Sequence, residues 1–355
     1  MKYFWIIFFG YLVLVLTGVV SFDPFTLTTG LVAGGSALLG TLGYNYDYVK
    51  ENTYCRYYEC CIPEWIPADM NKFRQEMEKM IFGQHIASKF VTNALEHHFE
   101  HLNKTTKPLV MSFHGTTGIG KTSITNVMKK AIYKLGINSK YVHTFNGRTS
   151  FPVEAKAEHY REELIHIVKN AVSSCPLSLF VFDEVDKMPS TILNGISSML
   201  DSNYAQKEAI FNKPIYIFLS NTAGSEISKQ LTLLMNKGLS REDTELHHFE
   251  KITQAAVANA PGAPGVLVSS GLIKNAIIDF FIPFLPLEQR HLRKCIEREF
   301  LKTGITPSKE QIDEILRDVD YDSENVFFAA NGCKKMEKKV GVFVHSWRKQ
   351  SKNEM

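Results

Sequence analysis

Apolar residues recur along this chain at two spacings, which divide much of it into expected strands and helices. Short apolar runs at residues 109–113 and 177–182, and the run PIYIFLS that starts at Pro214, predict strands, and residues 139–145 (SKYVHTF) predict a short second strand. Because the run at 177–182 is too short for a typical helix, it suits a buried strand of a parallel sheet. Strands that are separated by helical segments indicate an α/β fold.

The other segments repeat their apolar residues at helical spacing. Helices are predicted at residues 71–102, 154–173, 312–319 and from Leu287 onward, and the end of the chain to Trp347 is predicted as a helix or a strand pair. A Gly-Gln-His loop at 83–85 interrupts the first of these segments. Prolines at 283 and 286 mark a boundary. We therefore expect a larger domain over residues 71–283 and a smaller helical lid domain over residues 284–355.

The strand at 109–113 runs directly into GTTGIGKTS, which has the pattern of a phosphate-binding P-loop. Its glycines let the backbone turn its N–H groups toward phosphate oxygens, where a Cβ atom would interfere. Lys121 can reach the β- and γ-phosphates, and the Thr122 hydroxyl is placed to bind Mg²⁺. The helix that follows adds partial positive charge. The expected phosphate-binding residues are Gly115, Thr116, Thr117, Gly118, Ile119, Gly120, Lys121, Thr122 and Ser123.

Polar side chains are expected at the ends of the next buried strands, where open α/β sheets bind their ligands. Asp183 is expected to hold Mg²⁺ through water, and Glu184 to polarise the water that attacks the γ-phosphate. An Asp-Glu pair alone would also fit a solvated strand end, but this one follows a P-loop by roughly 60 residues. Asn221 is expected to bind the γ-phosphate or the lytic water as a sensor-1 residue, although asparagine after a strand is often only a turn former.

Composition indicates an ordinary globular protein. Of the 355 residues 45% are hydrophobic and 22% are charged, and the formal net charge is +3. The scattered lysines form no basic block, so nucleic acid is not an expected partner. His247 and His248 have no Cys, Asp or Glu at ligand spacing, which favours a solvated or capping segment over a metal site.

The N-terminus predicts entry into the secretory pathway. One lysine precedes a long apolar run, and Val19 and Ser21 suit a cleavage site, so residues 1–21 are expected to be a signal peptide. The length of the run would also fit an uncleaved signal anchor. Residues 22–50 are apolar but diluted by Gly and Thr, and we expect them to associate with a membrane without crossing it; a Gly-rich linker is the alternative.

The six cysteines are then expected in a compartment that permits disulfides, although sequence leaves their pairing open. Three of them lie in a Cys-rich linker, residues 51–70. The sequence Asn-Lys-Thr at Asn103 is a glycosylation sequon in a stretch that is predicted to be a surface loop. Such sequons also occur by chance, so Asn103 is supporting evidence only.

From about Cys55 to the C-terminus the chain resembles the torsins, AAA+ ATPases of the endoplasmic reticulum lumen and nuclear envelope. The shared segments are YCRYYECC, IFGQHIA, FDEVDKM, FLSNTAG, FFIPFLPLEQRHLRKC and NGCKK. The resemblance implies a P-loop AAA+ fold, with a three-layer parallel-sheet domain and a helical lid. It also implies an ATPase that uses ATP and Mg²⁺ to remodel protein or membrane assemblies in the reticulum lumen and perinuclear space, in contact with the membrane.

The resemblance assigns further residues. Lys334 becomes the sensor-2 cation, and Cys333 becomes the partner of Cys295 in a redox-sensitive disulfide. Such a disulfide would couple redox state to lid position; a purely structural disulfide is the alternative. By likeness to AAA+ proteins, residues 81–86 are expected on the adenine side, with a glycine helix stop as the alternative. Thr122 departs from the asparagine of the best-known torsins and is an ordinary Mg²⁺ ligand.

The resemblance also implies partners. Torsins lack the arginine finger by which AAA+ neighbours stimulate one another, and Arg241 is not expected to serve as one although it lies in a plausible region. Luminal domains of type II membrane proteins are expected to supply the arginine, and self-association into hexamer-like or mixed rings is expected. Activity alone should be weak, because an arginine finger is worth about three to five orders of magnitude in turnover.

Two other classes of function compete with a partner-activated ATPase. One is a nucleotide-gated binding module, in which the ATP state rather than turnover matters. The other, a P-loop kinase or GTPase, is disfavoured because the sequence contains no NKxD-type guanine motif.

Overall fold

The structure is a computed structural model that describes residues 54–189, 191–202, 208–259, 267, 270–273, 275–323 and 327–353. The chain forms two compact units, Met1–Cys60 and Cys61–Met355. The expected signal peptide and membrane-associating segment lie outside the described residues. In the first unit a disulfide between Cys55 and Cys60 closes a short turn.

The second unit is built on a five-stranded sheet in the order β2-β3-β4-β1-β5, in which every pairing is parallel. The strands are β1 (Leu109–His114), β2 (Val142–Asn146), β3 (Leu179–Asp183), β4 (Ile215–Ser220) and β5 (Phe280–Pro283). Strands β1 and β4 are buried along their whole length, which explains why they are mostly apolar in the sequence. The sequence did not predict β5, because its residues end a longer apolar stretch without a boundary.

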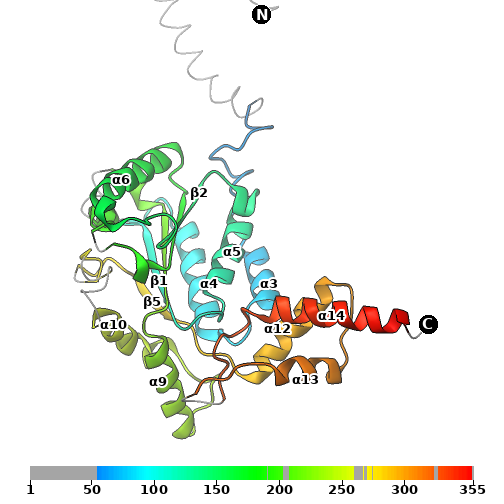
Figure 1. Ribbon diagram of the computed structural model, residues 1–355. Helices are drawn as coiled ribbons and strands as arrows, with labels where there is room; N and C mark the ends of the chain where they lie inside the picture. The colour runs from blue at the N-terminus through cyan, green and yellow to red at the C-terminus, as the bar shows by residue number, and fades with distance from the viewer. Residues whose placement is uncertain are drawn as a thin grey trace, which may run out of the picture. The chain divides into compact units, whose positions relative to one another are not determined.

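Helices cover both faces of this sheet, as Figure 1 shows, with α3, α4 and α5 on one side and α6 on the other. The helices of this part are α3 (Met70–Met80), α4 (His85–Glu100), α5 (Lys121–Ile132), α6 (Ala157–Ser174), α7 (Asn194–Ser197), α9 (Gly224–Asn236) and α10 (Glu250–Ala258). The predicted interruption of the first helical segment is the break between α3 and α4. The three layers are those expected of the α/β fold.

Rows of aromatic rings hold the central strands together. Phe180 of β3 stacks on Tyr216 of β4 with ring centroids 4.8 Å apart, and Phe182 stacks on Phe218 at 5.2 Å. All four rings are fully buried. Because parallel neighbours in register present their side chains on the same face, this packing fixes the relative position of the two strand ends that carry Asp183 and Asn221.

Three helices follow β5: α12 (Gln289–Lys302), α13 (Lys309–Arg317) and α14 (Met336–Asn353), which we call the C-terminal helices. Helix α12 begins two residues after the predicted start at Leu287, with Glu288 as its N-cap; the Glu288 N–H donates to His291 Nδ1 at 3.1 Å. The end of the chain is a helix, not a strand pair. Strand β5 ends at Pro283, where the boundary between the two domains is predicted. Among the described helices, none has the length and apolar character needed to cross a membrane.

Candidate nucleotide-binding site

A cavity of about 320 Å³ lies where the carboxyl ends of the strands meet the C-terminal helices. Most of the residues that were predicted from separate motifs line it together. From the P-loop, β3, β4 and the C-terminal segment these are Thr117, Gly118, Ile119, Gly120, Lys121, Thr122, Ser123, Asp183, Glu184, Asn221, Cys295, Cys333 and Lys334. Gly115 and Thr116 do not line the cavity, but their backbone carbonyls accept hydrogen bonds from Lys121.

The P-loop joins β1 to α5 as the sequence predicts. Gly118 and Gly120 have φ angles of 76° and 113°, a backbone conformation that residues other than glycine rarely adopt. Helix α5 begins at Lys121, so its unpaired N-terminal N–H groups belong to residues that border the cavity. A helix N-terminus of this kind favours phosphate.

Lys121 is held in the loop by three acceptors. Its Nζ donates to the Gly115 carbonyl at 2.6 Å, to the Thr116 carbonyl at 2.7 Å and to Asn221 Oδ1 at 3.0 Å. Burial lowers the pKa of Lys121 to about 8, against the opposing effect of Asp183 and Asp186. The P-loop lysine and the expected sensor residue of β4 are therefore in direct contact.

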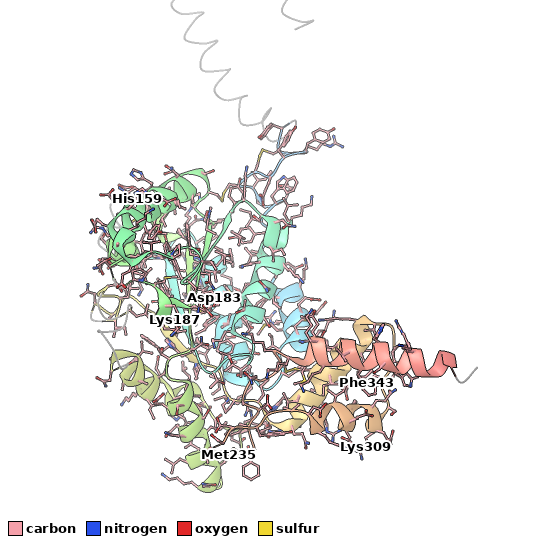
Figure 2. All side chains as sticks on the ribbon, viewed as in Figure 1. His159, Asp183, Lys187, Met235, Lys309 and Phe343 are labelled. Atoms are coloured by element: carbon pink, nitrogen blue, oxygen red, sulfur yellow. A yellow bond between two sulfur atoms is a disulfide. The ribbon has the colours of Figure 1, made fainter. Side chains whose placement is uncertain are left out.

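The oxygen donors expected for Mg²⁺ border the same cavity. Thr122 stands on the first turn of α5, and Asp183 ends β3. Burial raises the pKa of Asp183, and the N–H of Glu184 offsets part of this by donating to Asp183 Oδ1 at 2.9 Å. Figure 2 shows Asp183 and Lys187 at this end of β3. A hydroxyl and a carboxylate suit Mg²⁺, which prefers oxygen ligands and retains several waters.

Glu184 lies in a turn that leaves its carboxylate half exposed. Its φ angle is 54°, and a side chain at Gly147 would overlap its carbonyl oxygen, so the turn depends on that glycine. Arg148 Nε donates to Glu184 Oε2 at 2.8 Å. The carboxylate that is expected to polarise water is thus paired with an arginine from the turn after β2.

The segment Asn331–Lys334, which we call the NGCK turn, sits directly on the P-loop. The Cys333 N–H donates to the Gly118 carbonyl at 2.9 Å. A Cβ atom on Gly118 would overlap the Asn331 carbonyl, and one on Gly332 would overlap the Gly118 carbonyl. The contact therefore requires glycine on both sides, and it places Lys334 at the cavity.

A disulfide ties the NGCK turn to helix α12. It joins Cys333 to Cys295, and both cysteines border the cavity. The pairing expected from the resemblance is the one that the structure contains. The described residues include two further disulfides, Cys55–Cys60 and Cys61–Cys175.

The apolar end of the cavity is formed by Met80, Ile81, Phe82 and Leu287. Only the first part of the expected adenine-side segment, residues 81–86, reaches it. The Gln84 side chain points elsewhere: it donates to the carbonyls of Ile119 at 3.0 Å and Leu285 at 2.8 Å. Gln84 therefore braces the loop instead of contacting the ligand space.

Arg241 is buried in the protein, with a side chain only 1% exposed. Its guanidinium donates to the carbonyls of Gly83 at 2.6 Å and Pro286 at 2.8 Å, and pairs with Glu288 at 3.1 Å. Burial lowers its pKa to about 10. An arginine held in this way joins the loop before α4 to the start of α12 and is not presented to a neighbouring molecule.

Sequence reasoning missed three charged residues of the site. No sequence motif predicts Arg148, because it reaches Glu184 from a separate loop 36 residues away along the chain. Asp186 stands two residues after Glu184 in FDEVDKM, and its acidity could have drawn attention to it. Arg298 follows Cys295 on α12 by three residues, which places both on one helix face, and it donates to the Met80 carbonyl at 2.9 Å.

The fold and the cavity together define an α/β P-loop protein of the AAA+ class. The structure is similar to a solved chain of the S. cerevisiae Hsp104-ADP complex, with a TM-score of 0.54 and 16% identity, covering 81% of this chain and 49% of that one. A sequence model of the family described as Torsin matches residues 55–182. A Torsin-like relative that is 39% identical over 92% of this chain shows that the protein belongs to the torsin family.

Relatives in animals support this assignment over most of the chain. A Torsin-like protein of Drosophila melanogaster is 39% identical over 92% of this chain and 93% of its own length. A Torsin-like protein of Caenorhabditis elegans is 30% identical, with 91% of each chain covered. Torsin-3A of Mus musculus is 32% identical over 82% of this chain and 76% of its own.

Proposed function

We propose that this torsin binds ATP with Mg²⁺ and hydrolyses it. The observation that carries the proposal is that Lys121, Asp183, Glu184 and Asn221 border one cavity, next to a helix N-terminus. Phosphoryl transfer requires positioning and charge stabilisation more than covalent chemistry, and these residue types supply both.

The residues divide the work by their chemistry. The P-loop N–H groups and Lys121 bind the phosphates, and Lys334 adds a cation from the NGCK turn. Thr122 and Asp183 hold Mg²⁺, which neutralises charge that develops on the phosphates. When the hydrogen bond from Arg148 is broken, the Glu184 carboxylate accepts one from the attacking water instead. Asn221 orients the water or the γ-phosphate. Met80, Ile81 and Phe82 receive the base.

The chain is proposed to need an activating partner. Arg241 is buried in the fold, which leaves it unsuited to reach a neighbouring active site, and Arg148 is paired with Glu184 of its own chain. We infer that luminal domains of type II membrane proteins supply the arginine, within hexamer-like or mixed rings. The substrate of the remodelling activity is then a protein or membrane assembly, and the protein acts as a chaperone.

We further propose that the protein works in the reticulum lumen and perinuclear space, at the membrane. Three disulfides suit that compartment, and Asn103 of the sequon lies in an exposed turn where a glycan could be attached. The Cys295–Cys333 disulfide is proposed to respond to redox state, because it holds the turn that carries Lys334.

One observation favours the alternative, a nucleotide-gated binding module. Arg148 pairs with Glu184 and so competes with water for the carboxylate. In that case partners would respond to bound ATP, and turnover would have no role.

Phosphate release and ATP binding of the full chain, with and without candidate luminal domains, separate the two proposals. The Glu184→Gln variant should bind ATP like the wild type, retain the partner complex and release phosphate at least about a hundredfold more slowly, because an amide is a much weaker acceptor for the water proton. ATP binding without phosphate release in any of these conditions would favour the binding module. Loss of ATP binding in Glu184→Gln would argue against its role with water.

A further inference from the structure

A line of polar side chains lies below the P-loop, between the ends of β1 and β4. His114 precedes the P-loop, and Ser220 is its neighbour in register on β4. Ser112, His114 and Ser220 are buried, and Thr222 and Asp186 are mostly covered. We call these five residues the buried polar network; they are Ser112, His114, Thr222, Ser220 and Asp186.

The hydrogen bonds of this network follow one another without a gap. Ser112 Oγ lies 2.6 Å from His114 Nε2, and His114 Nδ1 lies 3.3 Å from Thr222 Oγ1. Thr222 Oγ1 is 2.8 Å from Ser220 Oγ, which donates to Asp186 Oδ1 at 3.2 Å. The line therefore connects the P-loop strand to a carboxylate in the turn after β3.

The carboxylate fixes the direction of the hydrogen bonds that lead from it to His114, and the neutral state of His114 fixes the last one. An ionised carboxylate only accepts, so the Ser220 hydroxyl donates its hydrogen bond to Asp186 and must accept from the Thr222 hydroxyl. Thr222 then accepts from His114 Nδ1–H, which leaves Nε2 to accept from Ser112. This arrangement needs neutral His114, and burial, followed by the nearby Lys121, lowers the pKa of His114 to about 3.

The same carboxylate oxygen holds the backbone of Asn221. The Asn221 N–H donates to Asp186 Oδ1 at 3.3 Å, while the Asn221 side chain accepts from Lys121 Nζ at 3.0 Å. Burial would raise the pKa of Asp186, but hydrogen bonds from Lys187 and from the Asn221 N–H outweigh it and lower that pKa. Asp186 thus remains an acceptor for Asn221.

We propose that Asp186 is a positioning residue for hydrolysis, which holds Asn221 at the phosphate end of the cavity. The rest of the buried polar network keeps that carboxylate aligned with the P-loop strand. The proposal rests on the proposed ATPase function and names two further residues for it, Asp186 and Thr222. Neither touches the ligand space, since neither borders the cavity.

The first test removes the acceptor. Asp186→Ala should lower kcat for phosphate release by about ten- to hundredfold, as expected for loss of a hydrogen bond to a charged group, while the dissociation constant for ATP changes by less than about threefold. Asp186→Asn keeps one acceptor oxygen and should retain at least about a third of wild-type kcat. An equal loss in both variants, or a rise in the ATP dissociation constant as large as the loss of kcat, would overturn the proposal.

A double-mutant cycle tests whether Asp186 acts through Asn221. If it does, Asp186→Ala should lower kcat by less than about threefold in an Asn221→Ala background, because the group that it positions is already gone. The same loss in both backgrounds would count against the proposal.

Two substitutions of Thr222 test the proposal even if the Asp186 variants fail to fold. Thr222→Val breaks the network and should lower kcat by about three- to tenfold, whereas Thr222→Ser keeps the hydroxyl and should not. Thr253→Val is the matched control: Thr253 is fully buried, and its hydroxyl has no hydrogen-bond partner among the residues that the structure describes. Equal effects of Thr222→Val and Thr222→Ser would refute the role of the hydroxyl.

Hydrogen exchange separates this proposal from the proposed function. The Asn221 amide should exchange faster in Asp186→Ala than in the wild type, with other β4 amides unchanged. If the Asn221 amide exchanges faster in Asp186→Ala but the wild type never releases phosphate, Asp186 positions Asn221 and the proposed ATPase activity is wrong. Unchanged exchange in an active ATPase would reject the positioning role alone.

Discussion

At the scale of single residues, two cations at the site are held by groups of the chain itself: Lys121 by three acceptors, and Arg148 by Glu184. Arg148 and Glu184 form an ion pair whose side chains are 65% and 31% exposed. Exposed pairs of this kind contribute about 0.2–1 kcal/mol, so the pair restrains the carboxylate only weakly.

Arg148→Ala should therefore raise basal turnover, by at most about fivefold, because about 1 kcal/mol corresponds to a factor of that size. Single-turnover phosphate release of the chain without partners measures it. Arg161→Ala removes the partly buried arginine of another ion pair, on α6, and should leave turnover unchanged. A decrease in Arg148→Ala would mean that the arginine assists the reaction.

Lys121 predicts a pH dependence of ATP binding. Its pKa of about 8 in the structure is set by burial, and bound phosphates would raise it. ATP should therefore bind most tightly below pH 8, and above it the affinity should fall by up to about tenfold per pH unit, as binding takes up a proton. Calorimetry at pH 9 in two buffers of different ionisation enthalpy should detect this uptake, and its absence would show that Lys121 is already charged.

At the scale of elements, the NGCK turn and the P-loop fit together through two glycines. Gly332→Ala should weaken ATP binding by about tenfold or more, because the added methyl group overlaps the Gly118 carbonyl and displaces the turn that carries Lys334. Gly304→Ala is the control: Gly304 also has a positive φ angle, 75°, but no atom of the described part of the chain lies within 4 Å of the added atom. If Gly332→Ala and Gly304→Ala lose equal ATP affinity, the cause is backbone strain and not the overlap with the Gly118 carbonyl.

The strands that carry the site could be predicted from the sequence, because parallel strands buried along their length are mostly apolar runs. The P-loop, Asp183, Glu184 and Asn221 could be predicted for the same reason, since each follows such a run. Contacts between separate segments could not. Arg148 reaches Glu184 and Gln84 reaches Leu285 through tertiary packing, which leaves no periodic trace along the chain.

At the scale of the whole molecule, the disulfides differ greatly in the length of chain that they close. Cys61 and Cys175 are separated by 114 residues, whereas Cys55 and Cys60 are separated by 5. In the chain-entropy account a disulfide stabilises the folded state by restricting the unfolded one, and the effect grows with loop length.

The double variant Cys61→Ser/Cys175→Ser should lose about 5 kcal/mol of the free energy of unfolding, and Cys55→Ser/Cys60→Ser only about 2 kcal/mol. Urea unfolding of the two variants under oxidising conditions gives the comparison. Similar losses would mean that local contacts, not loop length, set the contribution of each disulfide.

The paired glycines of the P-loop and the NGCK turn also bear on how other sequences are compared with this one. Neither Gly118 nor Gly332 can gain a side chain while the other segment stays in place. Substitutions at the two positions should therefore be linked across natural relatives: a chain with a larger residue at one should carry an altered or displaced segment at the other. Two residues far apart in the sequence would then be inherited as a unit, and a relative that has lost one glycine should bind nucleotide differently.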